Sequence, residues 1–582
     1  MSKTHTLLLL VTILFALILP PRLPAQQNPT SANLPPAAPL LSPSICGKGA
    51  FSFWLGDQSV GREEFEIKCQ PDGSYSASGH TDLKVGGSGV DLNTTLEVSK
   101  LGEHLSSTAK GTVAGRPFDQ SVIVKDVVAT VTSSGSSKDL PFVKGTSLLG
   151  GNIFFMFQFL LARYDVARGG IQEHPVFPNA QSKIERVSRD EVQATGIAAS
   201  PAPTPFDRYI ITVGMSNIIA WVDSKGRIAT LAVPVQNFAA VREEYASFVP
   251  SFKAILSAKM KEFELDYGAP AGASFTAQEV TVEAKGFTLA GTILVPKTGK
   301  PPFPAVITIT GSGQQTRDEY LPLPGLEKYR PFRQIAEALA SRGIAVLRVD
   351  DRGVGLSKGL DTLKVSTSAN FADDVRAQVD FLREIRDVDP RRIVLLGHSE
   401  GGMIAPIVAA TDPRIAAIVL MAGPAKRGDT IIAYQVNQGL ESDASLTEEA
   451  RAKARADQQE VMRKAIAGDP SAPESLRSAW MRYFLEYDPL PTIRKVRQPI
   501  LILQGELDRQ VTADQAEMLA KAAREAGNRD VTARVFPGLN HLFLPAKTGA
   551  VTEYSSLSTN TIPDEVMKPL TDWLIEKLRV GK

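Results

Sequence analysis

The chain has 582 residues, which is enough for about three to four average domains, and its 43% hydrophobic content permits full cores. Its formal net charge is +1 and its basic residues are spread among acidic ones, which argues against a nucleic-acid-binding surface. Two large globular domains fit these numbers best.

Residues 1–25 resemble a secretory signal. Lys3 supplies a positive start, the apolar run at 7–19 has the length of a signal core, and Leu-Pro-Ala at 23–25 resembles a small-residue cleavage site. The apolar run is shorter than the ~20 residues that span a bilayer, and an uncleaved anchor is the alternative. We therefore expect an exported protein, periplasmic or extracellular, with no stable membrane span after cleavage of the signal.

A proline-rich segment follows at 26–44 and is expected to be an extended tether. Cys46 and Cys69 come next, both early in the first domain. In an oxidising compartment an even number of cysteines permits one disulfide, and these two are close enough in sequence to link adjacent strands. Two separate buried thiols are the alternative. Metal binding is not expected, because no CxxC motif and no paired histidines accompany them.

Segments of alternating polar and apolar residues dominate the first domain, residues 45–265, as in Glu64–Cys69 and Ser121–Lys125. This alternation predicts a mainly antiparallel β domain. The apolar segment 152–161 breaks the pattern and predicts a buried helix that plugs the sheet, with a ligand-binding or membrane-touching helix as the alternative. No catalytic grouping is visible in this half of the chain.

From residue 275 to residue 582 apolar strand-like segments alternate with amphipathic helical ones. This pattern predicts an α/β domain with a mostly parallel sheet and helices on both faces, whose chemistry lies at the carboxyl ends of the strands. A polar helical insertion at 424–488 is expected to form a cap over the active site, and a surface helix pair without that role is the alternative. The expected strands are 289–295, 304–310, 344–349, 392–397, 415–421, 499–504 and 531–536, and the expected helices are 331–342, 370–386, 401–411, 512–526 and 564–578.

The pentapeptide Gly-His-Ser-Glu-Gly at 397–401 lies between an apolar run and a helix-like stretch. In this context a sharp turn lifts Ser399 above the sheet edge, and the amino end of the helix favours negative charge on an attacked carbonyl. The same Gly-x-Ser-x-Gly pattern recurs at 355–359, but a loop follows Ser357, which is therefore expected to be a turn residue. The sequence thus predicts Ser399 as a nucleophile.

A nucleophilic serine needs a base and a carboxylate that orients the base. His541 is the only histidine after Ser399 and follows a predicted strand, as does Asp508. Glu506 is the alternative carboxylate, but Asp508 lies deeper in the loop and should reach the histidine better. His398 adjoins the nucleophile, points elsewhere in such a turn, and is expected to be structural.

An oxyanion hole needs two backbone N–H groups. One is expected from Glu400, the residue after the nucleophile, and the other from the glycine-containing loop after strand 304–310. Ser312 is the expected second donor, with Gly313 as the alternative. A phosphate-binding role for this loop is not favoured, because no Gly-Lys-Ser/Thr follows.

Taken together, these motifs make residues 275–582 similar to the α/β-hydrolase superfamily, in the branch of bacterial serine esterases, dienelactone hydrolases and prolyl oligopeptidases. The chain departs from many relatives at Thr310, where they have a histidine before the glycine. The matching pieces are Thr310-Gly-Ser-Gly313, Asp350-Asp-Arg-Gly-Val-Gly-Leu-Ser357, Gly397-His-Ser-Glu-Gly401, Gly505-Glu-Leu-Asp508 and Asn540-His541.

The predicted reaction is hydrolysis of a small-molecule carboxylic ester through an acyl-enzyme, without a metal or organic cofactor. A serine peptidase acting on short peptides is an alternative, although about 200 amino-terminal residues are too few for a full gating propeller. A thioesterase is another, but its usual coenzyme A substrates are scarce outside the cytoplasm. In a non-enzyme alternative the β domain binds a glycan, lipid or partner and the hydrolase half is secondary.

Overall fold

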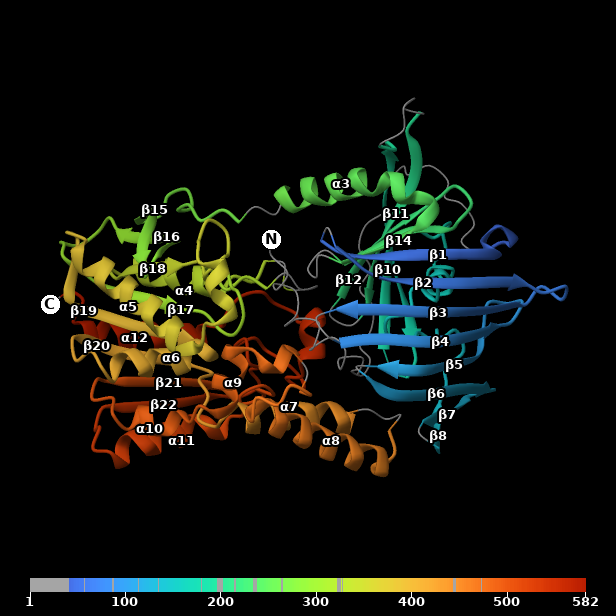
Figure 1. The fold of residues 1–582 in the computed structure, drawn as a ribbon. Helices are drawn as coiled ribbons and strands as arrows, with labels where there is room; N and C mark the ends of the chain where they lie inside the picture. The colour runs from blue at the N-terminus through green and yellow to red at the C-terminus, as the bar shows by residue number, and fades with distance from the viewer. Residues whose placement is uncertain are drawn as a thin grey trace.

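A computed structural model describes residues 41–581 apart from 57, 86–87, 114, 134, 179, 196–201, 214–215, 234–237, 263–264, 322–325, 327, 443–445 and 473. The described chain forms a β domain and an α/β domain that lie side by side (Figure 1). The expected signal at 1–25 and most of the expected tether at 26–44 fall outside the described residues. Within the described residues, no helix has the length and apolarity that crossing a bilayer requires.

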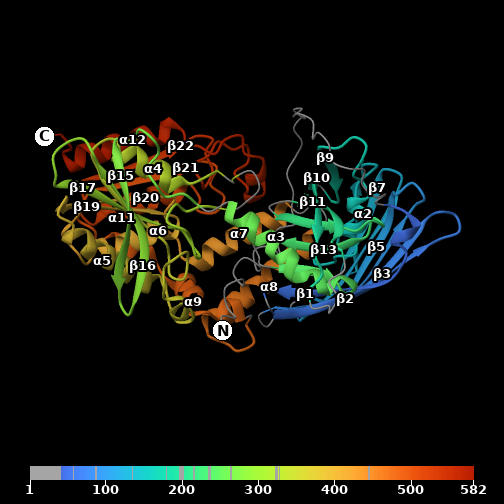
Figure 2. The ribbon, with the colours of Figure 1, turned by 90° about the horizontal axis from the view of Figure 1, so that it is seen from above.

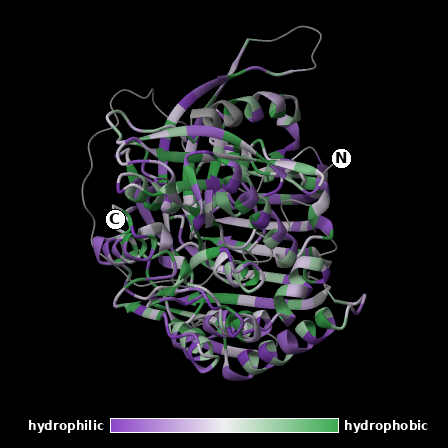
Figure 3. Ribbon diagram, turned by 90° about the vertical axis from the view of Figure 1, so that its left-hand side faces the viewer, coloured by the Kyte–Doolittle hydropathy of each residue, from purple (hydrophilic) through white to green (hydrophobic). Residues whose placement is uncertain are grey.

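The β domain is one antiparallel sheet of 14 strands in the order β8-β7-β6-β5-β4-β3-β2-β1-β14-β13-β12-β11-β10-β9. Buried and more exposed residues alternate in the middle of β2, because neighbouring side chains point to opposite faces and one face is buried. Hydrophilic and hydrophobic segments are interspersed along the whole ribbon (Figure 3). The predicted antiparallel β domain is therefore confirmed. Its strands are β1 (Gly47–Leu55), β2 (Gln58–Cys69), β3 (Tyr75–Val85), β4 (Ser88–Val98), β5 (His104–Val113), β6 (Arg116–Lys125), β7 (Val128–Ser133), β8 (Ser136–Pro141), β9 (Ile171–Val176), β10 (Ala180–Val192), β11 (Thr204–Val213), β12 (Ser216–Val222), β13 (Ile228–Val233) and β14 (Phe238–Arg242).

The buried face of this sheet packs against the short helix α2 (Phe157–Leu161) and the turn before it. The plug expected at 152–161 is present, although its α-helical part has only 5 residues. The N–H groups of Phe154 and Phe155 donate to the Glu63 carboxylate of β2 at 2.9 and 2.8 Å, and the Thr81 hydroxyl donates to it at 2.9 Å. Burial nevertheless raises the pKa of Glu63 to about 7.

The raised pKa of Glu63 should make the β domain less stable as the pH rises. The folded chain binds this proton more tightly than the unfolded chain, whose pKa is near 4.5. The stabilisation is therefore complete below the unfolded pKa and is lost, by about 3 kcal/mol, as the pH rises through the folded pKa. Urea unfolding followed by circular dichroism on either side of this window should show the loss.

The variant Glu63→Gln should flatten this pH dependence, because it cannot titrate. Glu64→Gln is the matched control, since Glu64 is the exposed neighbour on the same strand. It should leave the pH dependence of the wild type unchanged. Equal pH dependence in the wild type and in Glu63→Gln would show that another group is responsible.

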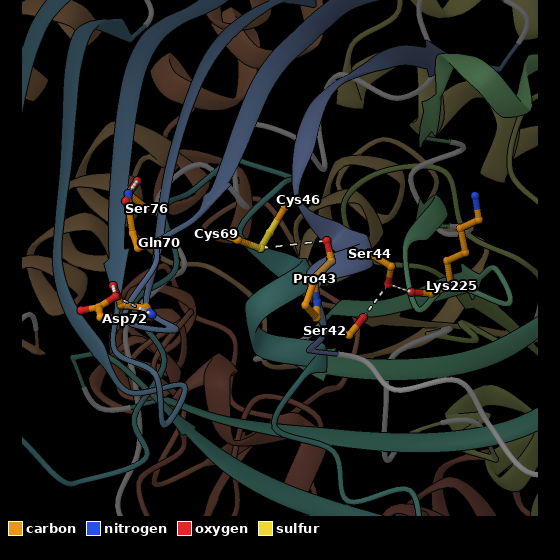
Figure 4. Close-up of a disulfide and its surroundings, with 10 residues drawn as sticks. Ser42, Pro43, Ser44, Cys46, Cys69, Gln70, Asp72, Ser76 and Lys225 are labelled. Atoms are coloured by element: carbon orange, nitrogen blue, oxygen red, sulfur yellow. Dashed lines mark hydrogen bonds between the residues drawn. A yellow bond between two sulfur atoms is a disulfide. The ribbon is translucent and has the colours of Figure 1, made fainter.

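Cys46 and Cys69 form a disulfide that joins the segment before β1 to the end of β2, with Cα atoms 5.8 Å apart (Figure 4). The two strands are neighbours in the sheet, with Gly47 opposite Ile67. The bond closes a loop between residues 23 apart in sequence, which restricts the unfolded chain and stabilises the fold by about 3 kcal/mol.

A helix that the sequence pattern does not predict, α3 (Val249–Glu262), follows the last strand of the β domain. Phe252 of this helix lies 4.9 Å from the ring of Trp221 in β12, in a small core on the outer face of the sheet. This second core explains why every residue of β13 is buried. From α3 the chain passes into the α/β domain (Figure 1).

The α/β domain has an eight-stranded sheet in the order β15-β16-β18-β17-β19-β20-β21-β22. The strands from β18 to β22 pair in parallel, whereas β15 and β16 form an antiparallel edge. The sequence pattern misses β15. The strands are β15 (Phe275–Ala284), β16 (Phe287–Pro296), β17 (Phe303–Ile309), β18 (Ala345–Val349), β19 (Val388–His398), β20 (Ile415–Met421), β21 (Ile500–Gly505) and β22 (Val531–Phe536).

Helices cover both faces of this sheet, as predicted. One core contains residues of α4 (Pro331–Ala340) and α12 (Asp564–Leu578). The core on the other face contains residues of α5 (Ser368–Glu384), α6 (Glu400–Ala409) and α11 (Asp514–Glu525). The apolar strands between these two cores are buried on both faces of the sheet, which is typical of parallel sheets.

The insertion at 424–488 is helical, as predicted. It consists mainly of α7 (Gly428–Ser442), α8 (Glu448–Ile466) and α9 (Ala479–Glu486), followed by the short α10 (Pro489–Ile493). Helices α7 and α8 extend toward the β domain in both views (Figure 1 and Figure 2). A hydrogen bond of 3.4 Å from Lys138 Nζ of β8 to the carbonyl of Leu446 joins the insertion to the β domain.

Candidate active site

Ser399 occupies the sharp turn between β19 and α6. Its backbone is strained, with φ 52° and ψ −117°, values that residues with a side chain rarely adopt. The turn is tight because a side chain at Gly397 would collide with the carbonyl of Gly401, and one at Gly401 would collide with the carbonyl of Ile309. The sequence thus specifies a strand-to-helix turn that leaves the serine at the carboxyl edge of the sheet.

Asp508 and His541 follow β21 and β22 at the same edge and are hydrogen-bonded to each other. His541 Nδ1 lies 2.7 Å from Asp508 Oδ2. The other oxygen, Oδ1, accepts the N–H groups of Gln510 and Val511 at 2.7 and 2.8 Å. These bonds fix the carboxylate, so that Nδ1 of the imidazole carries the proton and Nε2 keeps its lone pair.

The alternative carboxylate, Glu506, accepts the N–H of Gly538 at 2.9 Å and is not bonded to His541. Within the described chain the Ser399 hydroxyl makes no hydrogen bond to His541. Such bonds are often long in unliganded hydrolases and tighten when substrate binds. The structure therefore joins Asp508 to His541 directly and places Ser399 on the same edge of the sheet.

The loop after β17 passes beside the nucleophile. A Cβ atom added at Gly311 would lie 3.3 Å from Cβ of Ser399. The Gly311 N–H is committed to Glu319 Oε1 at 2.7 Å, so it is not available to an oxyanion. The N–H groups of Ser312 and Gly313 have no acceptor among the residues that the structure describes, and both stay candidates for the second donor.

Two aspartates, the half-buried Asp351 and the buried Asp350, hold this loop in place. The Thr310 hydroxyl and the Gln315 N–H both donate to the Asp351 carboxylate at 2.9 Å. The Arg317 N–H donates to Asp350 at 2.7 Å. Thr310 is therefore an anchor of the loop.

The second serine of the Gly-x-Ser-x-Gly type, Ser357, is a turn residue, as expected. Its hydroxyl donates to the carbonyl of Asp350 and accepts the N–H of Ala290, both at 2.8 Å. It is buried, and no helix follows it directly. Both hydrogen-bonding roles of its hydroxyl serve the local fold.

His398 does more than the sequence indicates. Its Nδ1 lies 2.9 Å from Oε1 of Glu319, and its Nε2 lies 3.0 Å from the carbonyl oxygen of His541. The two imidazole rings lie 4.9 Å apart between centroids. Glu319 itself has φ 54°, an unusual value for a residue with a long side chain. Sequence reasoning had a signal for His398, its place before the nucleophile, but none for Glu319.

The Glu400 carboxylate joins the nucleophile turn to the insertion. It accepts the Ser368 hydroxyl of α5 at 2.6 Å and the Trp480 indole N–H of α9 at 2.8 Å. Burial raises the pKa of Glu400, although hydrogen bonds from Ser368, Trp480 and Ser312 act in the opposite direction. Helix α9 therefore contacts the residue next to the nucleophile, and Trp480 stacks on Phe484 at 5.6 Å.

The α/β half of the chain is similar in sequence to known proteins. Residues 325–546 match the family described as serine aminopeptidase, S33. An esterase from Thermotoga maritima, EstD, is 30% identical over 323 residues, which is 54% of this chain and 71% of that protein. A thiohydrolase from Arthrinium phaeospermum is 33% identical over 88 residues, 15% of this chain and 28% of that protein.

Among solved structures, an esterase from Pyrococcus furiosus is 18% identical and covers 55% of this chain and 96% of its own, with a TM-score of 0.36. The sequence match to the Thermotoga protein has more weight, because it spans most of that relative at 30% identity. It also agrees with the mostly parallel sheet and with the strand-to-helix turn around Ser399. The chain therefore belongs to the α/β-hydrolase family of serine hydrolases.

Proposed function

We propose that the protein hydrolyses carboxylic esters of small molecules through a catalytic triad of Ser399, His541 and Asp508. The observation that supports the triad best is the 2.7 Å hydrogen bond between Asp508 and His541, at the sheet edge where the strained Ser399 turn ends. Ester substrates are favoured by the relative from Thermotoga maritima, which is an esterase.

In this proposal His541 Nε2 takes the proton of the Ser399 hydroxyl while its oxygen attacks the ester carbonyl. The N–H of Glu400, in the first turn of α6, and the N–H of Ser312 or Gly313 stabilise the oxyanion. The protonated His541 then gives its proton to the departing alcohol, which leaves an acyl-enzyme on Ser399. Water, deprotonated by the same histidine, releases the acid and restores the serine.

The four hydrogen bonds to the Asp508 carboxylate explain why it stays in place during this cycle. It accepts two backbone N–H groups through Oδ1. Through Oδ2 it binds His541 and also the Gln504 side chain, which donates at 2.7 Å. A fully bonded, buried carboxylate stabilises the imidazolium that forms in the transition state without moving.

Two alternative activities are each supported by a specific observation. The match to the serine aminopeptidase family favours amide bonds of short peptides as an alternative substrate. The match to the thiohydrolase from Arthrinium phaeospermum favours thioesters, although it covers 15% of this chain. All three reactions use the same acyl-enzyme, so the choice between them lies in the substrate pocket.

We also propose that the protein is exported. The support is the signal-like sequence at 1–25 together with the disulfide between Cys46 and Cys69, because such bonds persist in oxidising compartments. A shorter mature chain in the periplasm or the medium, detected by mass spectrometry of its amino terminus, would agree with this proposal. Recovery of the intact chain from the cytoplasm would contradict it.

The reaction itself is tested with a panel of nitrophenyl esters of different acyl length, beside nitrophenyl thioesters and aminoacyl anilides. We expect turnover of esters and, with a fluorophosphonate probe, covalent labelling of Ser399 that a peptide map can locate. Turnover of anilides without turnover of esters would make the protein a peptidase. Absence of both turnover and labelling would favour a binding role for the chain.

A further inference from the structure

We propose that the buried pair formed by His398 and Glu319 is a positioning device, which ties the loop of the catalytic base to the loop of the oxyanion hole. The inference rests on the proposed function, because it assigns these two residues to the reaction of Ser399 and His541. His398 directly precedes the nucleophile Ser399 in the sequence.

Three hydrogen bonds in series make the connection. The carbonyl oxygen of His541 lies 3.0 Å from Nε2 of His398. Nδ1 of the same ring lies 2.9 Å from Oε1 of Glu319, and this oxygen also accepts the Gly311 N–H at 2.7 Å. The series therefore joins the main chain of His541 to the main chain of Gly311, which comes directly before Ser312.

The proton inventory of the pair follows from these partners. A carbonyl oxygen only accepts, so Nε2 of His398 carries a proton. Nδ1 faces an oxygen of Glu319, and a hydrogen bond there needs a second proton, shared by the pair. Burial lowers the pKa of His398, but the charge and hydrogen bond of Glu319, with help from the His541 carbonyl and Asp508, raise it above the usual value overall.

The groups that face the pair favour this extra proton. Glu319 approaches His398 from the loop after β17, and His541 and Asp508 approach from the loops after β22 and β21. On the remaining sides the ring centroids of Phe543 and His398 lie 6.2 Å apart, and the Tyr329 hydroxyl is near Glu319. His398 and Glu319 are 8% and 4% exposed, so water cannot replace a lost bond.

Loss of the shared proton should release both loops. Because its pKa is raised, the pair keeps the shared proton to higher pH than an ordinary histidine does, and it becomes deprotonated as the pH rises through that higher pKa. The Nδ1 lone pair would then face the Glu319 carboxylate, which breaks the middle bond of the series. We therefore expect kcat to fall on the alkaline side with the titration of this pair.

Two substitutions of Glu319 separate geometry from charge. Glu319→Gln keeps an acceptor oxygen but removes the charge, so the alkaline fall in kcat should move to lower pH by about one unit or more. Glu319→Ala removes the acceptor, and kcat should fall about 10²-fold at every pH while KM changes little. The rates are measured with a nitrophenyl ester across the pH range.

Asp351→Asn is the matched control. Asp351 anchors the same loop through Thr310 and Gln315 but makes no contact with His398. This variant should lower activity without moving the alkaline fall. The inference is overturned if Glu319→Gln and the wild type share one pH profile, or if Asp351→Asn moves the profile as much as Glu319→Gln.

Histidine NMR of the full chain tests the pair independently of turnover and of the folding of Glu319→Ala. The signal of His398, assigned by its loss in His398→Asn, should titrate with a pKa above 6.5 in the wild type and at lower pH in Glu319→Gln. Titration below 6.5 in the wild type would overturn the inference. If the wild type does not turn over nitrophenyl esters although its His398 titrates above 6.5, the proposed function fails and the inference about the pair does not.

Discussion

Replacing Ser399 by alanine is expected to lower kcat for ester hydrolysis by about 10⁶-fold. The variant lacks the hydroxyl that forms the acyl-enzyme, so only uncatalysed attack by water assisted by the oxyanion N–H groups remains. The alanine should fit the turn about as well as serine, because the backbone strain at φ 52° is common to both. Initial rates with a nitrophenyl ester test the expected fall in kcat. Thermal unfolding of the wild type and of Ser399→Ala tests whether the turn is kept.

Ser357→Ala is the control that the chain itself offers, because this serine has the same sequence context. Its hydroxyl bonds the carbonyl of Asp350 and the N–H of Ala290. Its loss should cost about 1–3 kcal/mol of stability while kcat stays within about tenfold of the wild type. If Ser399→Ala kept more than a hundredth of the activity, the nucleophile would have to be another residue.

The α/β domain could be predicted from the sequence because its elements carry clear periodicities. The helix expected at 564–578 has those bounds in the structure, and every expected strand of this domain is present. The strand β15 (Phe275–Ala284) was missed, since it mixes exposed and half-buried residues at the antiparallel edge of the sheet. An edge strand lacks the continuous apolar run that identifies a strand buried on both faces.

In the β domain the sequence pattern predicts the strands but does not predict the helix α3. Its partners, Trp221 and Phe206, lie on strands far back in the sequence, and their outer face becomes apolar only when the sheet has formed. The plug at 152–161 was visible because its apolar run breaks the alternation around it. The buried Glu63 that holds the plug could not be found, since it looks like any polar residue of an alternating strand.

The site could be predicted as far as it depends on strand ends. Ser399, Asp508 and His541 each follow their own strand, and topology brings such positions to one edge. The contacts that support them are long-range: Glu319 is 79 residues from His398, and Trp480 is 80 residues from Glu400. No local pattern in the sequence encodes these pairs, so they emerge only from the packed structure.

Replacing Asp508 by asparagine is expected to lower kcat by about 10⁴-fold. The backbone N–H groups of Gln510 and Val511 both donate to Oδ1, so the amide oxygen must take that position. The amide NH₂ then faces Nδ1 of His541, which has to accept a hydrogen bond instead of donating one. The imidazole is thereby held in the tautomer with its proton on Nε2, where it cannot take the proton of Ser399.

Glu506→Gln is the matched control for this variant. Its carboxylate lies in the same loop but bonds the N–H of Gly538, so kcat should stay within about tenfold of the wild type. The tautomer gives a second readout, since ¹⁵N NMR of His541 should show the proton on Nδ1 in the wild type and on Nε2 in Asp508→Asn. An unchanged tautomer with unchanged kcat would mean that Asp508 does not orient the base, and the triad would lose its third member.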